Sequence, residues 1–198
     1  ARDVLARLIY GFRISILFGF VLTFFSMIIG VSAGAIQGYF GGKIDLFFQR
    51  LMELMMTIPV LFLIITIIAF YPGGGIWLIM VVIGMTGWTG IARYTRAEFL
   101  KTRNQDYVSA SIAIGNPTFR TIFRHILPNS IAPVMVAVVF GIAGAILTES
   151  TLSFLGLGSA TSFSWGAILS VARGATYAWW LALFPGFAIF LTITTYNL

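Results

Sequence analysis

The stretch from Ile14 to Ile36 contains no charged residue. About 20 consecutive apolar residues are enough for a helix to cross the roughly 30 Å hydrocarbon core of a bilayer. The composition agrees, because 59% of the chain is hydrophobic and only 9% is charged, whereas a soluble domain carries about 25% charged residues. So little charge cannot cover a water-exposed surface. The sequence therefore predicts an all-α, polytopic membrane protein.

Five apolar stretches are long enough to span the bilayer. They lie at about 14–36, 46–70, 76–92, 131–151 and 179–198. With their loops they predict one transmembrane domain over residues 1–198. The start without methionine and the end inside an apolar stretch indicate a chain trimmed at both ends.

Features inside the second and third stretches refine this picture. Arg50 and Glu53 are three residues apart, so they share a helix face and can pair or lie at headgroup level. Pro59 should kink the second helix. The Pro- and Gly-rich segment 71–75 predicts a turn that joins the second and third spans as a hairpin.

Gly30, Gly34 and Gly38 are spaced four residues apart, so they form a smooth strip along one face of the first predicted helix. Such strips let another helix approach closely, so we interpret this one as a packing surface rather than a functional site. The same interpretation applies to the small residues of two later spans, Gly84, Gly87 and Gly90 in the third and Gly141 with Ala145 in the fourth.

Basic residues predict the orientation. One side of the membrane would hold Lys43, Arg93, Arg96, Lys101, Arg103, Arg120 and Arg124. The other would hold Arg2, Arg7, Arg13 and Arg173. The excess on the first side favours a cytoplasmic 93–130 loop. It also explains the net charge of +6 without nucleic-acid binding.

Catalytic and cofactor chemistry finds little support. The chain has no cysteine and one histidine, His125, so thiolate and multi-histidine metal sites are excluded. Gly42-Lys43 ends like a phosphate-binding loop, but Gln37 and Ile44 occupy positions where that motif needs Gly and Ser or Thr. We therefore predict no cofactor, no metal site and no enzymatic activity. Glu149, near the outer end of the fourth span, either lines a pathway or pairs structurally.

The 93–130 segment is the one long polar stretch. Helical spacing places Tyr107, Ala110, Ser111 and Ile114 on one face. Gly115 should end this helix in the left-handed conformation, and Asn116-Pro117 should start the next as N-cap and first residue. The second helix repeats the pattern with Phe119, Ile122, Phe123 and Ile126, its Arg120 and Arg124 on the other face, and Pro128 closing the unit before the fourth span.

Ala110-Ser111, then Gly115, then His125-Ile126-Leu127-Pro128 resemble the "EAA" coupling loop of ABC importer permeases. Ser109 and Ser111 depart from that pattern, where an acidic residue and a second alanine are usual. Asp106-Tyr107-Val108 and the run from Phe123 to Asn129 are similar to the dipeptide/oligopeptide/nickel branch, and the whole chain is most similar to its C-type subunit. Further matching runs are Arg2-Asp3-Val4-Leu5, Thr148-Glu149, 152–158, Trp165-Gly166 and Pro185-Gly186.

The resemblance implies half of a translocation pathway in a bacterial or archaeal inner membrane, in a family that normally has six spans. The expected solute is a dipeptide, an oligopeptide or a related small solute such as glutathione or a nickel chelate. The implied partners are a second permease as a heterodimer, two ATPase subunits and an extracytoplasmic solute-binding protein. The ATPase-coupling residues would be Asp106, Tyr107, Ala110, Ser111, Gly115, Arg120, Arg124, Leu127 and Pro128. The alternative is a secondary transporter or channel that works without ATP.

Overall fold

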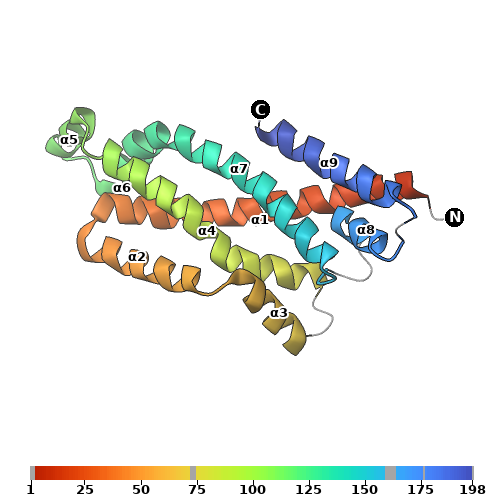
Figure 1. The fold of residues 1–198 in the computed structure, drawn as a ribbon. Coiled ribbons are helices and arrows are strands. Elements are labelled where there is room, and N and C mark those ends of the chain that lie inside the picture. The colour runs from red at the N-terminus through yellow and green to blue at the C-terminus, as the bar shows by residue number, and fades with distance from the viewer. Residues whose placement is uncertain (1–2, 72–74, 159–163, 176, 198) are drawn as a thin grey trace. The chain divides into compact units, whose positions relative to one another are not determined.

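The computed structural model describes residues 3–71, 75–158, 164–175 and 177–197. Within these ranges all regular secondary structure is helical and no strand occurs (Figure 1). This confirms the all-α prediction. Residues 72–74 of the expected turn between the second and third spans lie outside the described ranges.

The first two predicted spans correspond to three helices. Helix α1 covers Val4–Phe40, and α2 (Gly42–Thr57) and α3 (Val60–Phe70) divide the second stretch between them. The chain bends by 70° between α2 and α3. Ile58 takes an extended conformation there because the ring of Pro59 excludes helical geometry from the preceding residue. The predicted kink is confirmed as a complete break.

The remaining helices are α4 (Gly75–Thr102), α5 (Asp106–Ala113), α6 (Thr118–Arg120), a π-helical turn η1 (Thr121–Ile126), α7 (Leu127–Phe154), α8 (Trp165–Ala172) and α9 (Trp180–Asn197). Of these, α4 and α7 extend beyond the predicted spans, α9 lies within its predicted span, and the others lie in predicted loops. Val4–Phe40 and the continuous stretch Thr118–Phe154 are each long and apolar enough to cross a membrane. The bent pair α2–α3 makes a third candidate, so a total of five spans stays a prediction.

The described chain divides into two compact units. Unit 1 comprises residues 1–23, 60–84 and 139–198. Its main core joins Phe18 of α1 and Ile64 of α3 to Val82 of α4 and Leu152 of α7. A second cluster packs Trp165 of α8 and Ile189 of α9 against Ile146 of α7, and the indole of Trp165 donates a hydrogen bond to the carbonyl of Leu8 at 3.0 Å.

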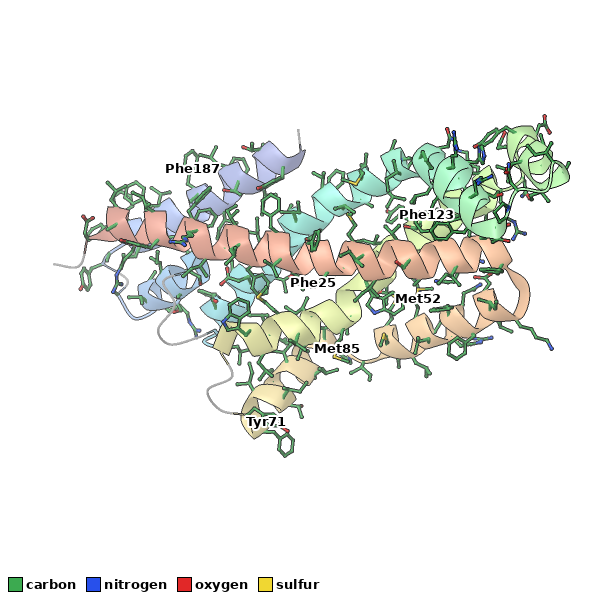
Figure 2. The ribbon with its side chains drawn as sticks, turned by 180° about the vertical axis from the view of Figure 1, so that it is seen from behind. Phe25, Met52, Tyr71, Met85, Phe123 and Phe187 are labelled. Carbon is green, nitrogen blue, oxygen red and sulfur yellow. The ribbon has the colours of Figure 1, made fainter. Side chains whose placement is uncertain are left out.

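Unit 2 comprises residues 24–59 and 85–138. Here α2 turns back beside the end of α1, as Figure 1 shows, and Met52 of α2 is buried with Ala33 and Ala92 (Figure 2). The reversal occurs at Gly41 and Gly42, which both have positive φ. A residue with a Cβ is strained in this region, so the turn depends on glycine.

The glycine strip of α1 lies against α4 in unit 2. A Cβ added at Gly34 would lie 2.5 Å from the carbonyl oxygen of Ala92, and one at Gly30 would lie 2.8 Å from that of Trp88. An added Cβ at Gly38 would clash with Phe99. The predicted packing surface is confirmed. Gly90 of α4 differs, because an added Cβ there would meet nothing within 4 Å, so its place on a packing surface stays a prediction.

Candidate functional site

The end of α5 is fixed by Gly115. The amide of Asn116 donates to the carbonyl of Ser111 at 3.2 Å, and the amide of Gly115 donates to that of Ile112 at 2.9 Å. These two bonds form the Schellman motif, in which the residue after the helix takes the left-handed conformation. Gly115 does so with φ of 81°. The sequence-based prediction for Gly115 is therefore confirmed.

Asn116 plays a different part from the one predicted. The residue before α6 with non-helical geometry is Pro117, and no side chain caps this helix. Instead, the side-chain Nδ2 of Asn116 donates a hydrogen bond to the hydroxyl of Ser111 at 3.1 Å. The side-chain Oδ1 of Asn116 accepts a hydrogen bond from Arg120 at 3.3 Å. The assignment of Asn116 as N-cap is wrong, because its side chain turns back to hold α5 against the start of the next helix.

One side of this helix–Gly–helix element is buried in unit 2. Val108 of α5 and Ile126 of η1 pack with Phe99 of α4, and all three are fully buried. Ser111 is buried as well, and its hydroxyl lies 3.4 Å from that of Thr121. The apolar contact with Phe99 therefore holds the element to the end of α4, and the Ser111–Thr121 contact joins the two helical parts of the element to each other.

Several large apolar side chains of the element are exposed. Ile114 and Phe119 are 79% and 71% exposed, and Tyr107, Ile112 and Phe123 are exposed with them. Figure 2 shows Phe123 in this region. Ala110 shares this exposure, so the predicted common face is divided, with Ser111 turned inward and its expected companions outward. We call Tyr107, Ile112, Ile114, Phe119 and Phe123 the apolar patch.

Pro128 does not close the unit, so that prediction is wrong. The helix runs without interruption from Thr118 to Phe154, with Pro128 at its second α7 residue. The π-helical turn Thr121–Ile126 directly precedes it. Its wider hydrogen-bond spacing accommodates the proline ring and the missing N–H. Leu127, beside Pro128, is partly buried on the Phe99 cluster.

Charged members of the predicted site lie on the surface. Asp106 is exposed in the first turn of α5, where a carboxylate interacts favourably with the helix dipole. Arg120 and Arg124 are exposed, and Arg120 reaches the side chain of Asn116. The exposed surface of the element therefore combines apolar, basic and acidic side chains.

Two contacts fasten the end of α4, from which the element projects. Arg103 donates to the carbonyls of Gly38 and Tyr39 at 3.1 and 2.9 Å, and so satisfies the free carbonyls at the end of α1. The hydroxyl of Ser130 in α7 donates to that of Thr102 at 3.0 Å, and both residues are buried. The end of α4 is thus tied to α1 and to α7.

An ion pair links α4 to α2 at Arg96, before the end of α4. The Nε and one terminal nitrogen of Arg96 donate to the two carboxylate oxygens of Asp45, at 2.5 and 2.6 Å. Both residues lie outside the predicted spans. The hydrogen bonds from Arg96 are the main cause that lowers the pKa of Asp45 below its ordinary value. The pair is well shielded, because the side chains are 28% and 13% exposed.

Glu149 of α7 is buried in unit 1. Its carboxylate accepts hydrogen bonds from Ser153 at 2.7 Å, from Ser15 of α1 at 2.9 Å and from Ser150 at 3.5 Å. This arrangement favours the structural alternative for Glu149, since hydroxyl donors satisfy the carboxylate. A role in the pathway stays a prediction. The pairing of Arg50 with Glu53, at 2.6 Å, is confirmed.

Sequence reasoning missed Asp45, Arg103 and Thr121 as members of this region. Asp45 and Arg96 are 51 residues apart in the chain, so no local spacing pairs them. A local signal existed for Asp45 alone, because an acidic residue just after two glycines is typical of the first turn of a helix. Arg103 was predicted only as one of the basic residues that indicate the membrane orientation. Nothing in the sequence indicates that its side chain caps the end of α1.

Comparisons with known proteins identify the family. The model of the family described as "Binding-protein-dependent transport system inner membrane component" matches residues 26–198. The peptidoglycan transport system permease protein YejE of Agrobacterium fabrum is 42% identical over 195 residues, which is 98% of this chain and 51% of that protein. The oligopeptide permease OppC of Haemophilus influenzae is 40% identical, with 99% of this chain and 63% of that protein covered.

A third relative, the dipeptide permease DppC of Bacillus subtilis, is 38% identical over 99% of this chain and 62% of its own length. The chain thus spans between about half and two thirds of the length of these relatives. The resemblance to peptide-branch permeases seen in the coupling loop is confirmed. The chain is a multi-pass inner-membrane protein and belongs to the family of inner-membrane components of binding-protein-dependent transport systems.

Proposed function

We propose that this chain is the membrane-spanning subunit of an ATP-driven ABC importer and forms half of its translocation pathway. The solute is a peptide or a related small molecule. Family membership over residues 26–198 supports this proposal, together with the peptide, oligopeptide and peptidoglycan transport named for its relatives. ATP hydrolysis belongs to separate ATPase chains.

The apolar patch on the helix–Gly115–helix element is the observation that carries the proposal. Large apolar side chains exposed together at a polar loop are typical of a protein-docking surface. A rigid bend at Gly115 presents them, and Val108, Phe99 and Ile126 anchor the element to α4. An ATPase subunit that binds this patch would therefore move α4 with it.

The proposed assembly contains a second permease, two ATPase subunits and an extracytoplasmic solute-binding protein. The second permease would complete the pathway, since exposed apolar and small residues on these helices leave surfaces for another membrane chain. Solute choice would rest with the binding protein. Within the described residues this chain offers few buried polar groups beyond Glu149, Gln37 and hydroxyl side chains.

Reconstitution tests the proposal. The full-length protein that contains this chain is placed in vesicles with a second permease, the ATPases and a binding protein, and uptake of labelled peptide is measured with and without ATP. We expect uptake only with ATP and all components. Uptake that proceeds equally without ATPase subunits would contradict the proposal and favour the secondary-transporter alternative.

Exchange of the binding protein tests the assignment of specificity. When a binding protein of different solute preference replaces the first and this chain is unchanged, the transported solute should follow the binding protein. If the solute range stays fixed, this chain contains the selective site.

A further inference from the structure

A polar groove of about 340 Å³ lies in unit 2 between α2 and α4. Gln49, Met52 and Glu53 of α2 line one side, and Arg93 and Arg96 of α4 line the other. These residues are at the start of the predicted 46–70 span and just beyond the end of the 76–92 span. The groove is therefore at the level where lipid headgroups meet the protein.

The charges around the groove leave one cation without a counterion. Arg96 is held by Asp45, and Glu53 is held by Arg50 at 2.6 Å. Arg93 is exposed and forms no hydrogen bond or ion pair with any residue that the structure describes. The groove thus has one excess positive charge, which a singly charged anion would neutralise.

The surfaces that continue from the groove into the predicted membrane region are apolar. Met56 follows Glu53 on the same face of α2 and is 55% exposed. On α4, Met85 lies about three helical turns before Arg96 on the same face and is 60% exposed (Figure 2). A ligand with an anionic head and an apolar tail would satisfy both parts of this surface.

We propose that the groove binds the phosphodiester headgroup of an anionic phospholipid, with Arg93 as its main ligand. A guanidinium donates two parallel hydrogen bonds to phosphate oxygens, which an ammonium cannot do. The acyl chains lie along the exposed methionine side chains of α2 and α4. The site is independent of the transport activity proposed above, because it rests on the groove and its charges alone.

Native mass spectrometry of the natural complex containing this chain tests the proposal. The complex is purified in detergent and titrated with phosphatidylglycerol, with phosphatidylcholine and with glycerol 3-phosphate. We expect preferential retention of phosphatidylglycerol. Arg93→Gln should weaken this retention about fivefold, the effect of one basic residue at a membrane surface. Arg93→Lys should weaken the retention of phosphatidylglycerol by an intermediate amount, because lysine keeps the positive charge but lacks the planar guanidinium group.

Lys43→Gln is the matched control, since it removes one exposed positive charge from α2 outside the groove lining and leaves Arg93 and the Arg50–Glu53 pair in place. Retention in Lys43→Gln should equal that of the unmodified complex. Equal retention in Arg93→Gln, Arg93→Lys and Lys43→Gln would overturn the site. Equal retention of phosphatidylcholine would overturn the assignment to an anionic lipid. Displacement of the lipid by glycerol 3-phosphate at equal concentration would show that a soluble phosphate is the ligand instead.

Discussion

Arg96 and Asp45 form a two-pronged ion pair that ties α4 to the first turn of α2. The carboxylate also accepts from the side chain of Gln49 at 2.9 Å. Asp45 is thus satisfied by a second residue of its own helix, and its negative charge lies at the favourable end of the α2 dipole. The pair therefore ties α2 to the helix that leads to the helix–Gly115–helix element.

Loss of the pair should destabilise the protein. Asp45→Asn removes the charge but keeps the shape, and we expect a loss of about 1.5–3 kcal/mol, as for hydrogen bonds to charged groups. Thermal unfolding of the purified complex measures this loss of stability. The control is Glu53→Gln, which breaks the exposed Arg50–Glu53 pair and should cost less than about 1 kcal/mol. Equal effects of the two substitutions would contradict a special role for Asp45.

The same pair predicts a pH dependence. Its hydrogen bonds lower the pKa of Asp45 below the ordinary value of 3.8. A lowered carboxyl pKa stabilises the folded state above the ordinary value, and this contribution is lost as the pH falls through the folded-state pKa. The stability difference between the natural protein and Asp45→Asn should therefore be constant near neutral pH and shrink below about pH 3.8. A difference that shrinks already near neutral pH would argue against this pair.

Gly34 should tolerate no side chain. A Cβ there would lie 2.5 Å from the Ala92 carbonyl oxygen and 2.6 Å from the Cβ of Thr95, so α1 and α4 would have to separate. We expect Gly34→Ala to cost about 1–3 kcal/mol, as overpacking does, measured by thermal unfolding. Gly90→Ala is the control, because open space surrounds Gly90 and alanine is the better helix former. It should be neutral or slightly stabilising.

Gly115 provides a test of the coupling element. Open space surrounds it, so the cost of a side chain arises from its φ of 81° alone. Gly115→Val should add roughly 1–2 kcal/mol of backbone strain and misplace the apolar patch. We expect normal membrane insertion with loss of uptake and of ATPase co-purification. Gly115→Asn should retain most activity, because asparagine tolerates this conformation. Normal uptake by Gly115→Val would show that the bend is not needed for coupling.

The comparison of Gly115 with Pro128 shows which parts of the site could be predicted. The stop at Gly115 follows from local backbone chemistry, since the left-handed Gly115 and the hydrogen bonds donated by the backbone N–H groups of Gly115 and Asn116 decide it. Whether the helix continues through Pro128 depends on the preceding turn. The π-helical hydrogen-bond spacing of η1 cannot be predicted from any single residue. The breaks and stops set by one residue were therefore predictable, whereas the accommodation of Pro128 was not.

Long-range polar pairs were the other part that the sequence could not provide. Asp45 and Arg96 meet only because the glycine strip brings α1 close to α4 and the turn at Gly41-Gly42 returns α2 beside them. The strip itself was predictable from spacing, but its partner was not. Asn116 shows the same limit locally, because its side chain can cap α6 or bond to Ser111, and only the folded geometry selects Ser111.

Glu149 allows its two alternative roles to be separated. If the carboxylate is a structural acceptor, Glu149→Gln should lower thermal stability by about 1–3 kcal/mol, since the amide accepts fewer hydrogen bonds. Ser153→Ala should destabilise more than Ser150→Ala, because the two hydroxyls lie 2.7 and 3.5 Å from the carboxylate. Unchanged stability in Glu149→Gln with altered uptake kinetics would instead support a role in the pathway.

The predicted orientation can be tested with single cysteines, because the chain contains none. Thr102, at the end of α4, is unsuitable as a probe since it is buried and bonded to Ser130. Thr118 is exposed in the 93–130 loop, and Tyr177 is 82% exposed between α8 and α9. If the basic 93–130 loop is cytoplasmic, an impermeant thiol reagent added to intact cells should label Tyr177→Cys and leave Thr118→Cys unlabelled. Permeabilised cells should show labelling of both, which establishes that each thiol is reactive. Labelling of Thr118→Cys alone in intact cells would reverse the orientation and place the apolar patch on the side opposite to any ATPase.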